Sequence, residues 1–178
     1  MNEIINKLEE GDLRSIGNVP EVVDMVLANP GLFKTVLQAM IHSDPGVRMR
    51  SSDAVEKISR SNPEHLQPHK AFLLNDVTGQ TQQEVRWHLA QVIPRLELTV
   101  LERTQAAKML FAFLDDPSKI VQTNSLQALV ELAWDDDELF PAVKKAVEDL
   151  VETGSPAVKN RADKLLPALL RKDGKNQS

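Results

Sequence analysis

The sequence predicts an all-α protein in which about four helix pairs stack behind an N-terminal helical cap. Three observations predict this fold class. Tyr is absent and Gly is sparse, while Leu, Ala, Val, Glu and Lys dominate, as is typical of helical proteins. Apolar residues recur at helical spacing along most of the chain. Four segments repeat one apolar pattern at nearly constant separation, which indicates an internal repeat.

The repeat is anchored on four valines that follow one another at intervals of 38, 36 and 37 residues. Apolar residues stand 7, 8 and 11 positions after each anchor. Because these offsets share one face of a helix, we expect the positions to point into a core. The anchors and the residues at offsets 7 and 11 are Val47, Ala54, Ile58, Val85, Val92, Leu96, Val121, Ala128, Leu132, Val158, Leu165 and Leu169.

The elements follow in order along the chain. Residues 1–30 carry short apolar stripes and are expected to form the cap of short helices. Four repeats follow, at about 31–61, 62–97, 98–134 and 135–170. Their first helices are expected at 32–42, 63–77, 99–114 and 138–151, and their second helices at 44–58, 82–96, 117–132 and 155–169. Because one pair cannot bury its apolar face alone, residues 1–170 should stack as a single domain. The polar tail, 171–178, is expected to be disordered.

Polar caps and prolines mark where the second helices begin. Asp44-Pro45 and Asp116-Pro117 place a capping side chain before a Pro, which is favoured in the first helical turn. Pro68 falls within a predicted first helix and Pro94 within a predicted second helix. Pro lacks the N–H needed in a helix interior, so both positions should bend their helices.

The pattern resembles the HEAT repeat family, whose second helices open with an Asp-Pro-x-Val-Arg motif. Asp44-Pro45-Gly46-Val47-Arg48 reproduces the motif, and Val85-Arg86 and Val158-Lys159 keep its second half. The resemblance covers about residues 30–170. It implies a right-handed α-solenoid whose second helices line the concave side. It also implies that Asp44, Arg48, Arg86 and Lys159 are structural residues in a ladder between neighbouring repeats.

Trp87 stands off the core stripe of its helix. It lies about 200° from the anchoring Val85, on the face that points away from the core. On a concave second-helix face, an aromatic side chain of this kind is a typical anchor for a partner. We expect the partner-binding residues to be Trp87, Gln91, Met49, Asp53, His88 and Arg50. The alternative is that Pro94 kinks the helix and Trp87 packs against a neighbouring repeat.

Two further features accompany this face. Arg50, His88 and Arg161 share a column that either belongs to the ladder or forms a basic strip along the groove edge. Trp134 ends its helix and is expected to close that end against the following turn.

Composition excludes several classes of protein. The net charge of −5 argues against a dedicated nucleic-acid binder, and the absence of Cys excludes thiolate chemistry and disulfides. No apolar run approaches the roughly 20 residues that span a bilayer, so we expect a soluble cytoplasmic protein without membrane contact. His65 and His69 have the spacing of metal ligands on a helix, but no third ligand accompanies them. We therefore expect no metal and no cofactor.

These observations predict a non-catalytic interaction module or scaffold that binds a protein or peptide partner in its groove. The alternative is a DNA-binding protein related to the alkylpurine DNA glycosylases, which are HEAT-like and hold DNA in a basic cleft with aromatic residues and an Asp at the lesion. Trp87 would supply an aromatic residue there, but Gln91, one turn further on, cannot act as a carboxylate. The partner and the oligomeric state are not encoded in any motif.

Overall fold

The computed structural model describes residues 2–12 and 15–176, and in these ranges the chain is all-helical, with ten α-helices, five short 3-10 helices and no strand. The helices form two compact units, Met1–Thr99 (unit 1) and Val100–Ser178 (unit 2). The sequence predicted one domain over residues 1–170 and no boundary within it. The boundary between the two units falls close to the predicted start of the third repeat.

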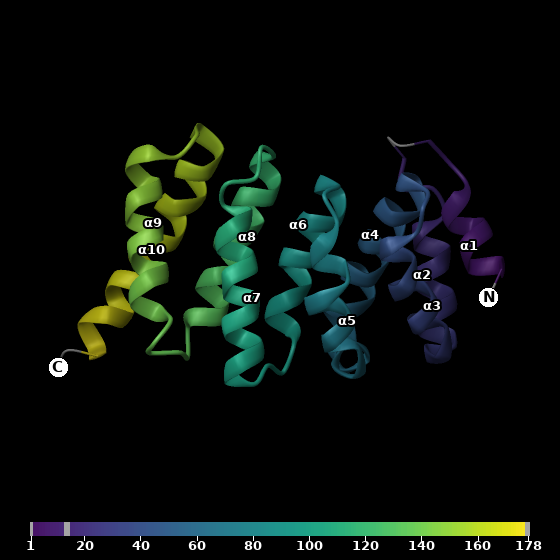
Figure 1. Ribbon diagram of the computed structural model, residues 1–178, viewed down its shortest axis with the longest axis horizontal. Coiled ribbons are helices and arrows are strands. Elements are labelled where there is room, and N and C mark those ends of the chain that lie inside the picture. The colour runs from purple at the N-terminus through teal and green to yellow at the C-terminus, as the bar shows by residue number, and fades with distance from the viewer. Residues whose placement is uncertain (1, 13–14, 177–178) are drawn as a thin grey trace. The chain divides into compact units, whose positions relative to one another are not determined.

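Unit 1 is organised around its longest helix, α4, which packs against α1, α2, α3 and α6 (Figure 1). The short cap helices predicted in residues 1–30 are present as α1 and α2. The α-helices of unit 1 are α1 (Asn2–Glu9), α2 (Val19–Ala28), α3 (Phe33–Gln38), α4 (Pro45–Ser61), α5 (Lys70–Asn75) and α6 (Gln83–Val92). Its 3-10 helices are η1 (Pro30–Leu32), η2 (Ala39–Ile41), η3 (Pro63–His69), η4 (Val77–Gly79) and η5 (Ile93–Arg95).

Unit 2 consists of two helix pairs. α7 (Val100–Phe113) packs on α8 (Lys119–Ala133), and α9 (Phe140–Thr153) packs on α10 (Pro156–Asn176). α8 also contacts both α9 and α10, so the second helices of the two pairs are neighbours. Figure 1 shows these four helices side by side, in green to yellow.

The second helices begin close to the predicted positions and the later first helices agree with the predicted ranges, whereas the first helices of repeats one and two are short. α3 ends in the 3-10 turn η2, and residues 63–69 form the 3-10 helix η3 rather than an α-helix. η3 contains Pro68, which has no N–H to bond to a carbonyl four residues earlier. Pro94 acts in the same way: α6 ends at Val92 and continues as η5, so Pro94 terminates this helix instead of kinking it.

The predicted core register is confirmed in both units. Of the twelve positions at offsets 0, 7 and 11, ten are buried, and the other two, Leu132 and Leu165, are half-buried. The offsets are correct because the helical period fixes which side chains share a face once a helix is formed. In unit 1 these positions lie on α4 and α6 and at Leu96, and in unit 2 they lie on α8 and α10.

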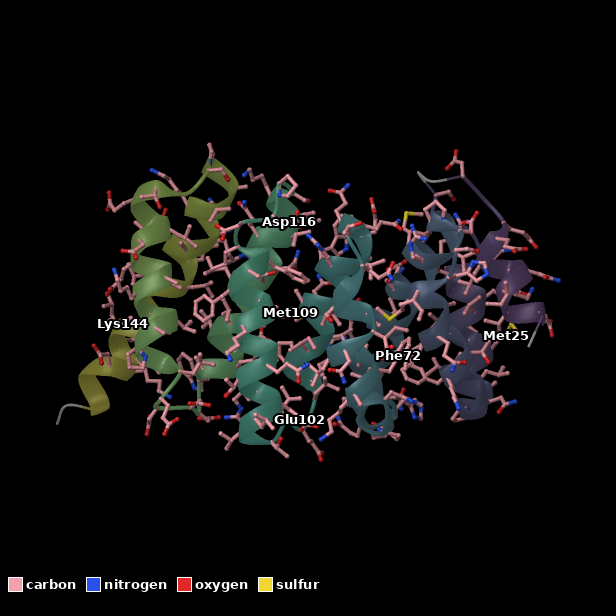
Figure 2. The ribbon with its side chains drawn as sticks, viewed as in Figure 1. Met25, Phe72, Glu102, Met109, Asp116 and Lys144 are labelled. Atoms are coloured by element: carbon pink, nitrogen blue, oxygen red, sulfur yellow. The ribbon has the colours of Figure 1, made fainter. Side chains whose placement is uncertain are left out.

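The C-terminal segment is a helix, which corrects the prediction of a disordered tail from residue 171. α10 continues to Asn176, and only residues 177 and 178 lie outside the described part. The last turns are held in place, because Lys144 Nζ of α9 lies 2.6 Å from Asp173 Oδ2 (Figure 2). Lys172 Nζ lies 5.0 Å from the ring centroid of Phe140 and 5.5 Å from that of Trp134. Trp134 remains 41% exposed beneath this ammonium group.

Candidate functional site

The beginnings of α4 and α6 are fixed against each other by a reciprocal pair of hydrogen bonds. α4 begins at Pro45 because Asp44 caps it, accepting from the backbone N–H of Val47 at 2.9 Å. Arg48 Nε donates to Gln82 Oε1 at 2.8 Å, and Gln82 Nε2 donates to the Pro45 carbonyl oxygen at 3.0 Å. Since Gln82 directly precedes α6, these bonds set the register of one helix along the other.

A cavity of about 340 Å³ opens between α4, α6 and the segment that follows α1, and we call it the Trp87 pocket. The structure brings five of the six predicted partner-binding residues to this cavity. Gln91 is the exception: it is half-buried one turn further along α6 and does not line the cavity. The lining residues are Ser15, Ile16, Met49, Arg50, Asp53, Glu84, Trp87 and His88.

Trp87 is half-buried, so its position lies between the two that the sequence allowed. Its indole Nε1–H donates to Nε2 of His88 at 3.1 Å. The two ring centroids are 5.3 Å apart and the ring planes are tilted by 51°. This bond satisfies the single donor of the indole and fixes the orientation of the ring at the edge of the pocket.

His88 is buried and connects α6 to α4. Its Nδ1 lies 2.7 Å from the carbonyl oxygen of Glu84, and its Nε2 lies 3.6 Å from Asp53 Oδ1. An indole N–H can only donate, so Nε2 accepts from Trp87 and the ring proton sits on Nδ1, where it donates to Glu84.

Asp53 supplies a charged group to the pocket. Its Oδ2 accepts from Lys57 Nζ at 2.7 Å, one turn further along α4. Burial raises the pKa of the Asp53 carboxyl, but the neighbouring side chains of His88 and Lys57 lower the pKa by more, so that it lies below its ordinary value. Asp53 is therefore a carboxylate, and Glu84 brings a second carboxyl group to the cavity.

Arg50 is buried, which argues against one of the two alternatives for its column, a basic strip along the edge of a groove. Its Nε donates to the carbonyl oxygen of Leu8 at 2.5 Å, Nη1 to that of Asp12 at 2.9 Å, and Nη2 to that of Glu9 at 3.3 Å. The Arg50 guanidinium thus holds the C-terminal end of α1 against α4. Its neighbour in the predicted strip, His88, is also buried, so the two side chains form no basic surface.

Two glycines allow Arg50 to reach α1. A Cβ on Gly46 would lie 2.5 Å from Arg50 Nη2, a distance that side chains do not tolerate. Gly17 has a φ of +51° and passes close to Arg50, whose Cδ would lie 3.2 Å from an added Cβ. The Gly46 of the Asp-Pro-Gly-Val-Arg motif therefore leaves room for the Arg50 guanidinium, which an added Cβ would force to shift.

In the column that includes Arg48 and Arg86, three side chains bond to the turn that precedes their own second helix, and Arg48 in addition bonds to Gln82 at the start of the following second helix. In three of the repeats, the side chain one position after the anchoring Val donates to a carbonyl oxygen six residues earlier. Asp116, the acceptor in the third repeat, is labelled in Figure 2. The pairs are Arg48 Nη1 with His42 (2.8 Å), Arg86 Nε with Gln80 (2.9 Å) and Gln122 Nε2 with Asp116 (2.7 Å). Asp44 likewise caps its own helix, Arg48 additionally reaches Gln82, and Lys159 is half-buried on α10.

The neighbouring column makes the contact between consecutive second helices. In unit 1 His88 of α6 approaches Asp53 of α4, with 3.6 Å between Nε2 and Oδ1. In unit 2 Arg161 Nη1 of α10 donates to Gln127 Oε1 of α8 at 3.0 Å. In both units the residue three positions after its anchoring Val meets the residue six positions after the preceding anchor. The repeated offset is visible in the sequence, but residue type alone did not identify which column would make the contact between second helices.

Sequence reasoning missed three lining residues of the Trp87 pocket: Ser15, Ile16 and Glu84. Ile16 is 53% exposed, in the segment between the two cap helices. The signal available for it was an isolated apolar residue in a Gly- and Ser-containing stretch, which indicates no particular neighbour. Glu84 precedes the anchor Val85 in the first turn of α6 and has no counterpart in the family motif.

The described residues contain no group of three or more His, Cys, Asp or Glu side chains placed to hold a metal ion. His65 and His69 both pack on Phe33, with ring centroids 5.6 Å and 6.1 Å from its ring. In the same part of the chain, no helix has the length and apolar character needed to cross a membrane. Comparison of this chain with protein-family models, with curated proteins and with solved structures finds no match.

Proposed function

We propose that this chain is a non-catalytic protein-interaction module that docks a peptide or protein partner on the face formed by α4 and α6, with Trp87 as the anchor. The observation that carries the proposal is the half-buried Trp87 ring at the edge of a cavity of about 340 Å³. Aromatic side chains in such positions supply much of the binding energy of protein interfaces, because they bury a large area at low entropic cost.

The rigid surroundings of the pocket support this role. Trp87 is held by His88, and His88 by the Glu84 carbonyl of the same helix. A residue held in place before binding loses little entropy on binding, so an ordered anchor favours affinity. α4 and α6 are themselves aligned by the bonds between Arg48 and Gln82, so the two walls of the pocket belong to one packed element.

The HEAT-like α-solenoid of about four helix pairs is part of the same proposal. It is supported by the packing of α8 on α10 and of α4 on α6, and by the contact at equal offsets in both units. In a solenoid of this kind the second helices form a continuous surface on which an extended peptide or a helix docks.

The second candidate, a DNA-binding protein related to DNA glycosylases, is favoured by one observation. Asp53 lies in the same cavity as Trp87, so an aromatic ring and a carboxylate stand side by side. Against it, the cavity also contains Glu84, and the N–H groups of Arg50 are directed at backbone carbonyls. A phosphate backbone would meet two carboxyl groups at this face, whereas DNA-binding clefts present cations.

The test of the proposed function is differential capture followed by a direct affinity measurement. Wild-type protein, Trp87→Ala and Trp134→Ala are used as baits, since Trp134 is an exposed tryptophan of unit 2. We expect a partner retained by wild type and Trp134→Ala and lost with Trp87→Ala. Its affinity, measured with purified components by calorimetry, should fall at least about tenfold with Trp87→Ala, as expected for an interface anchor. Equal affinity for the three proteins would contradict the proposal.

A further inference from the structure

Two acidic residues line the Trp87 pocket, whereas the N–H groups of Arg50, which also lines it, donate to backbone carbonyls near α1. Asp53 and Glu84 line the cavity together with Arg50. The Arg50 N–H groups donate to the carbonyl oxygens of Leu8 and Asp12, at and beyond the C-terminal end of α1. A helix C-terminus stabilises a cation through its aligned carbonyl dipoles, so the Arg50 charge is partly offset within the fold.

The Asp53 carboxylate has one strong partner and one weak one. Lys57 Nζ holds Oδ2 at 2.7 Å from the same helix, outside the residues that line the cavity. Oδ1 lies 3.6 Å from Nε2 of His88, which already accepts a hydrogen bond from Trp87. A separation of 3.6 Å is longer than a hydrogen bond, so this oxygen keeps capacity to accept from a bound group.

Apolar groups surround these carboxylates. The Trp87 ring, the Met49 thioether and the Ile16 side chain line the same cavity. Indole is the aromatic ring that attracts a cation most strongly, and long basic side chains bury their aliphatic stems on apolar surface while the charged head stays polar. The pocket therefore offers each part of a lysine or arginine side chain a complementary surface.

We infer that the partner inserts one lysine or arginine side chain into the Trp87 pocket, an inference that rests on the proposed function. The stem lies along Met49 and Ile16, and the charged head lies by the Trp87 ring between Asp53 and Glu84. The volume of about 340 Å³ is at the lower end of the roughly 300–1,000 Å³ of ligand sites, which suits a single long side chain.

Other occupants fit the pocket less well. A purely apolar side chain would desolvate two carboxyl groups without giving them a partner, which is unfavourable. An acidic side chain would meet like charges at short distance. A basic side chain compensates the carboxylates that it covers, and the net charge of −5 favours its approach from a distance.

Selection of peptides tests the inference. A phage-displayed library of random peptides is selected on the wild-type protein and counter-selected on Trp87→Ala. Selected peptides are synthesised, and binding is followed by the fluorescence of Trp87 in a Trp134→Phe protein, where it is the remaining one of the 2 tryptophans. Each Lys is then replaced by norleucine and each Arg by citrulline. We expect one such replacement to weaken binding about tenfold or more, which corresponds to about 1.4 kcal/mol.

A matched pair of variants locates the charge. Glu84→Gln removes a carboxylate of the pocket, and Glu97→Gln removes an exposed one elsewhere in unit 1. We expect Glu84→Gln to weaken peptide binding roughly three- to tenfold and Glu97→Gln to leave it unchanged at physiological salt, where distant exposed charges are screened. Trp87-dependent peptides that lack a required Lys or Arg would overturn the inference and leave the proposed function standing. Absence of any Trp87-dependent peptide or partner would overturn both.

Discussion

Trp87 Nε1 and His88 Nε2 lie 3.1 Å apart, so two consecutive side chains of α6 are joined at the mouth of a cavity. Consecutive residues on a helix point about 100° apart, yet these two rings meet, with their centroids 5.3 Å apart and their planes tilted by 51°. Trp87 is therefore half-buried and also lines the cavity. Its removal should affect both stability and binding.

Truncation of Trp87 should reduce stability less than truncation of a core residue on the same helix. Trp87→Ala removes a half-buried ring and leaves His88 accessible to water, so we expect a loss of about 1–2 kcal/mol, below the roughly 3–5 kcal/mol of a fully buried tryptophan. Leu89→Ala, at a residue with 0% exposure, should cost about 2–5 kcal/mol. Chemical denaturation of both variants measures the difference, and an equal or larger loss for Trp87→Ala would make it a packing residue.

Replacement of Arg50 should release the cap helix α1. Arg50→Met leaves the carbonyl oxygens of Leu8, Glu9 and Asp12 without their donor, and we expect a loss of about 2–4 kcal/mol. Arg50→Lys should recover little of it, because one ammonium group cannot reproduce the planar fork of donors.

Amide hydrogen exchange checks this prediction locally. The amides of α1 should exchange faster in Arg50→Met, while those of unit 2 should be unchanged. Arg171→Met, the same substitution at an exposed residue of α10, should change stability by no more than about 0.5 kcal/mol. Unchanged protection of α1 in Arg50→Met would show that the guanidinium does not hold the cap.

Glu56 should make the stability of unit 1 depend on pH in the acid range. Its Oε1 accepts from Arg95 Nη2 at 2.6 Å and from Arg60 Nε at 2.7 Å, and its side chain is 3% exposed. Burial raises the pKa of the Glu56 carboxyl, but hydrogen bonds from Arg60 and Arg95 lower the pKa by more, so it lies below its ordinary value of 4.5. Because the folded-state pKa is lowered, the stabilisation is fully present above 4.5 and is lost as the pH falls through the folded-state value.

Thermal melts at several pH values measure this dependence. Glu56→Gln should cost about 1.5–3 kcal/mol near neutral pH, since it removes hydrogen bonds to a charged group. The difference from wild type should shrink as the pH falls from 4.5 through the lowered folded-state pKa, where the wild-type carboxyl also becomes protonated. Glu97→Gln, at an exposed residue, is the control and should differ from wild type by a small amount at every pH. A constant penalty for Glu56→Gln would contradict the lowered pKa.

Duplex DNA should bind weakly at physiological salt. The net charge is −5 and the Trp87 pocket contains two carboxyl groups, so few cations are placed to release counterions from a phosphate backbone. Fluorescence anisotropy with a labelled duplex should give a Kd no tighter than about 10⁻⁶ M, within the range of non-specific binding. Sub-micromolar affinity with a steep salt dependence, or release of alkylated bases, would instead favour the DNA glycosylase alternative.

Sequence periodicity was sufficient to predict the helical fold class, the positions of most helices and the core register. The offsets from Val47, Val85, Val121 and Val158 are local properties of a chain in helical conformation, so they need no knowledge of neighbouring elements. The same count placed Trp87 off the core stripe, and Met49 and Asp53 beside it. Residue type and local spacing also identified the cap at Asp44.

The tertiary structure decided which partner each long polar side chain reaches. Arg48 and Arg86 were expected to bridge neighbouring repeats. Both bind carbonyl oxygens of their own preceding turns, and Arg48 also reaches Gln82, which precedes α6. Arg50 is drawn inward because α1, some forty residues earlier, presents unpaired terminal carbonyls that a guanidinium can satisfy. Contacts of this kind depend on how separate segments meet, and a pattern read along one helix contains no information about that distance or direction.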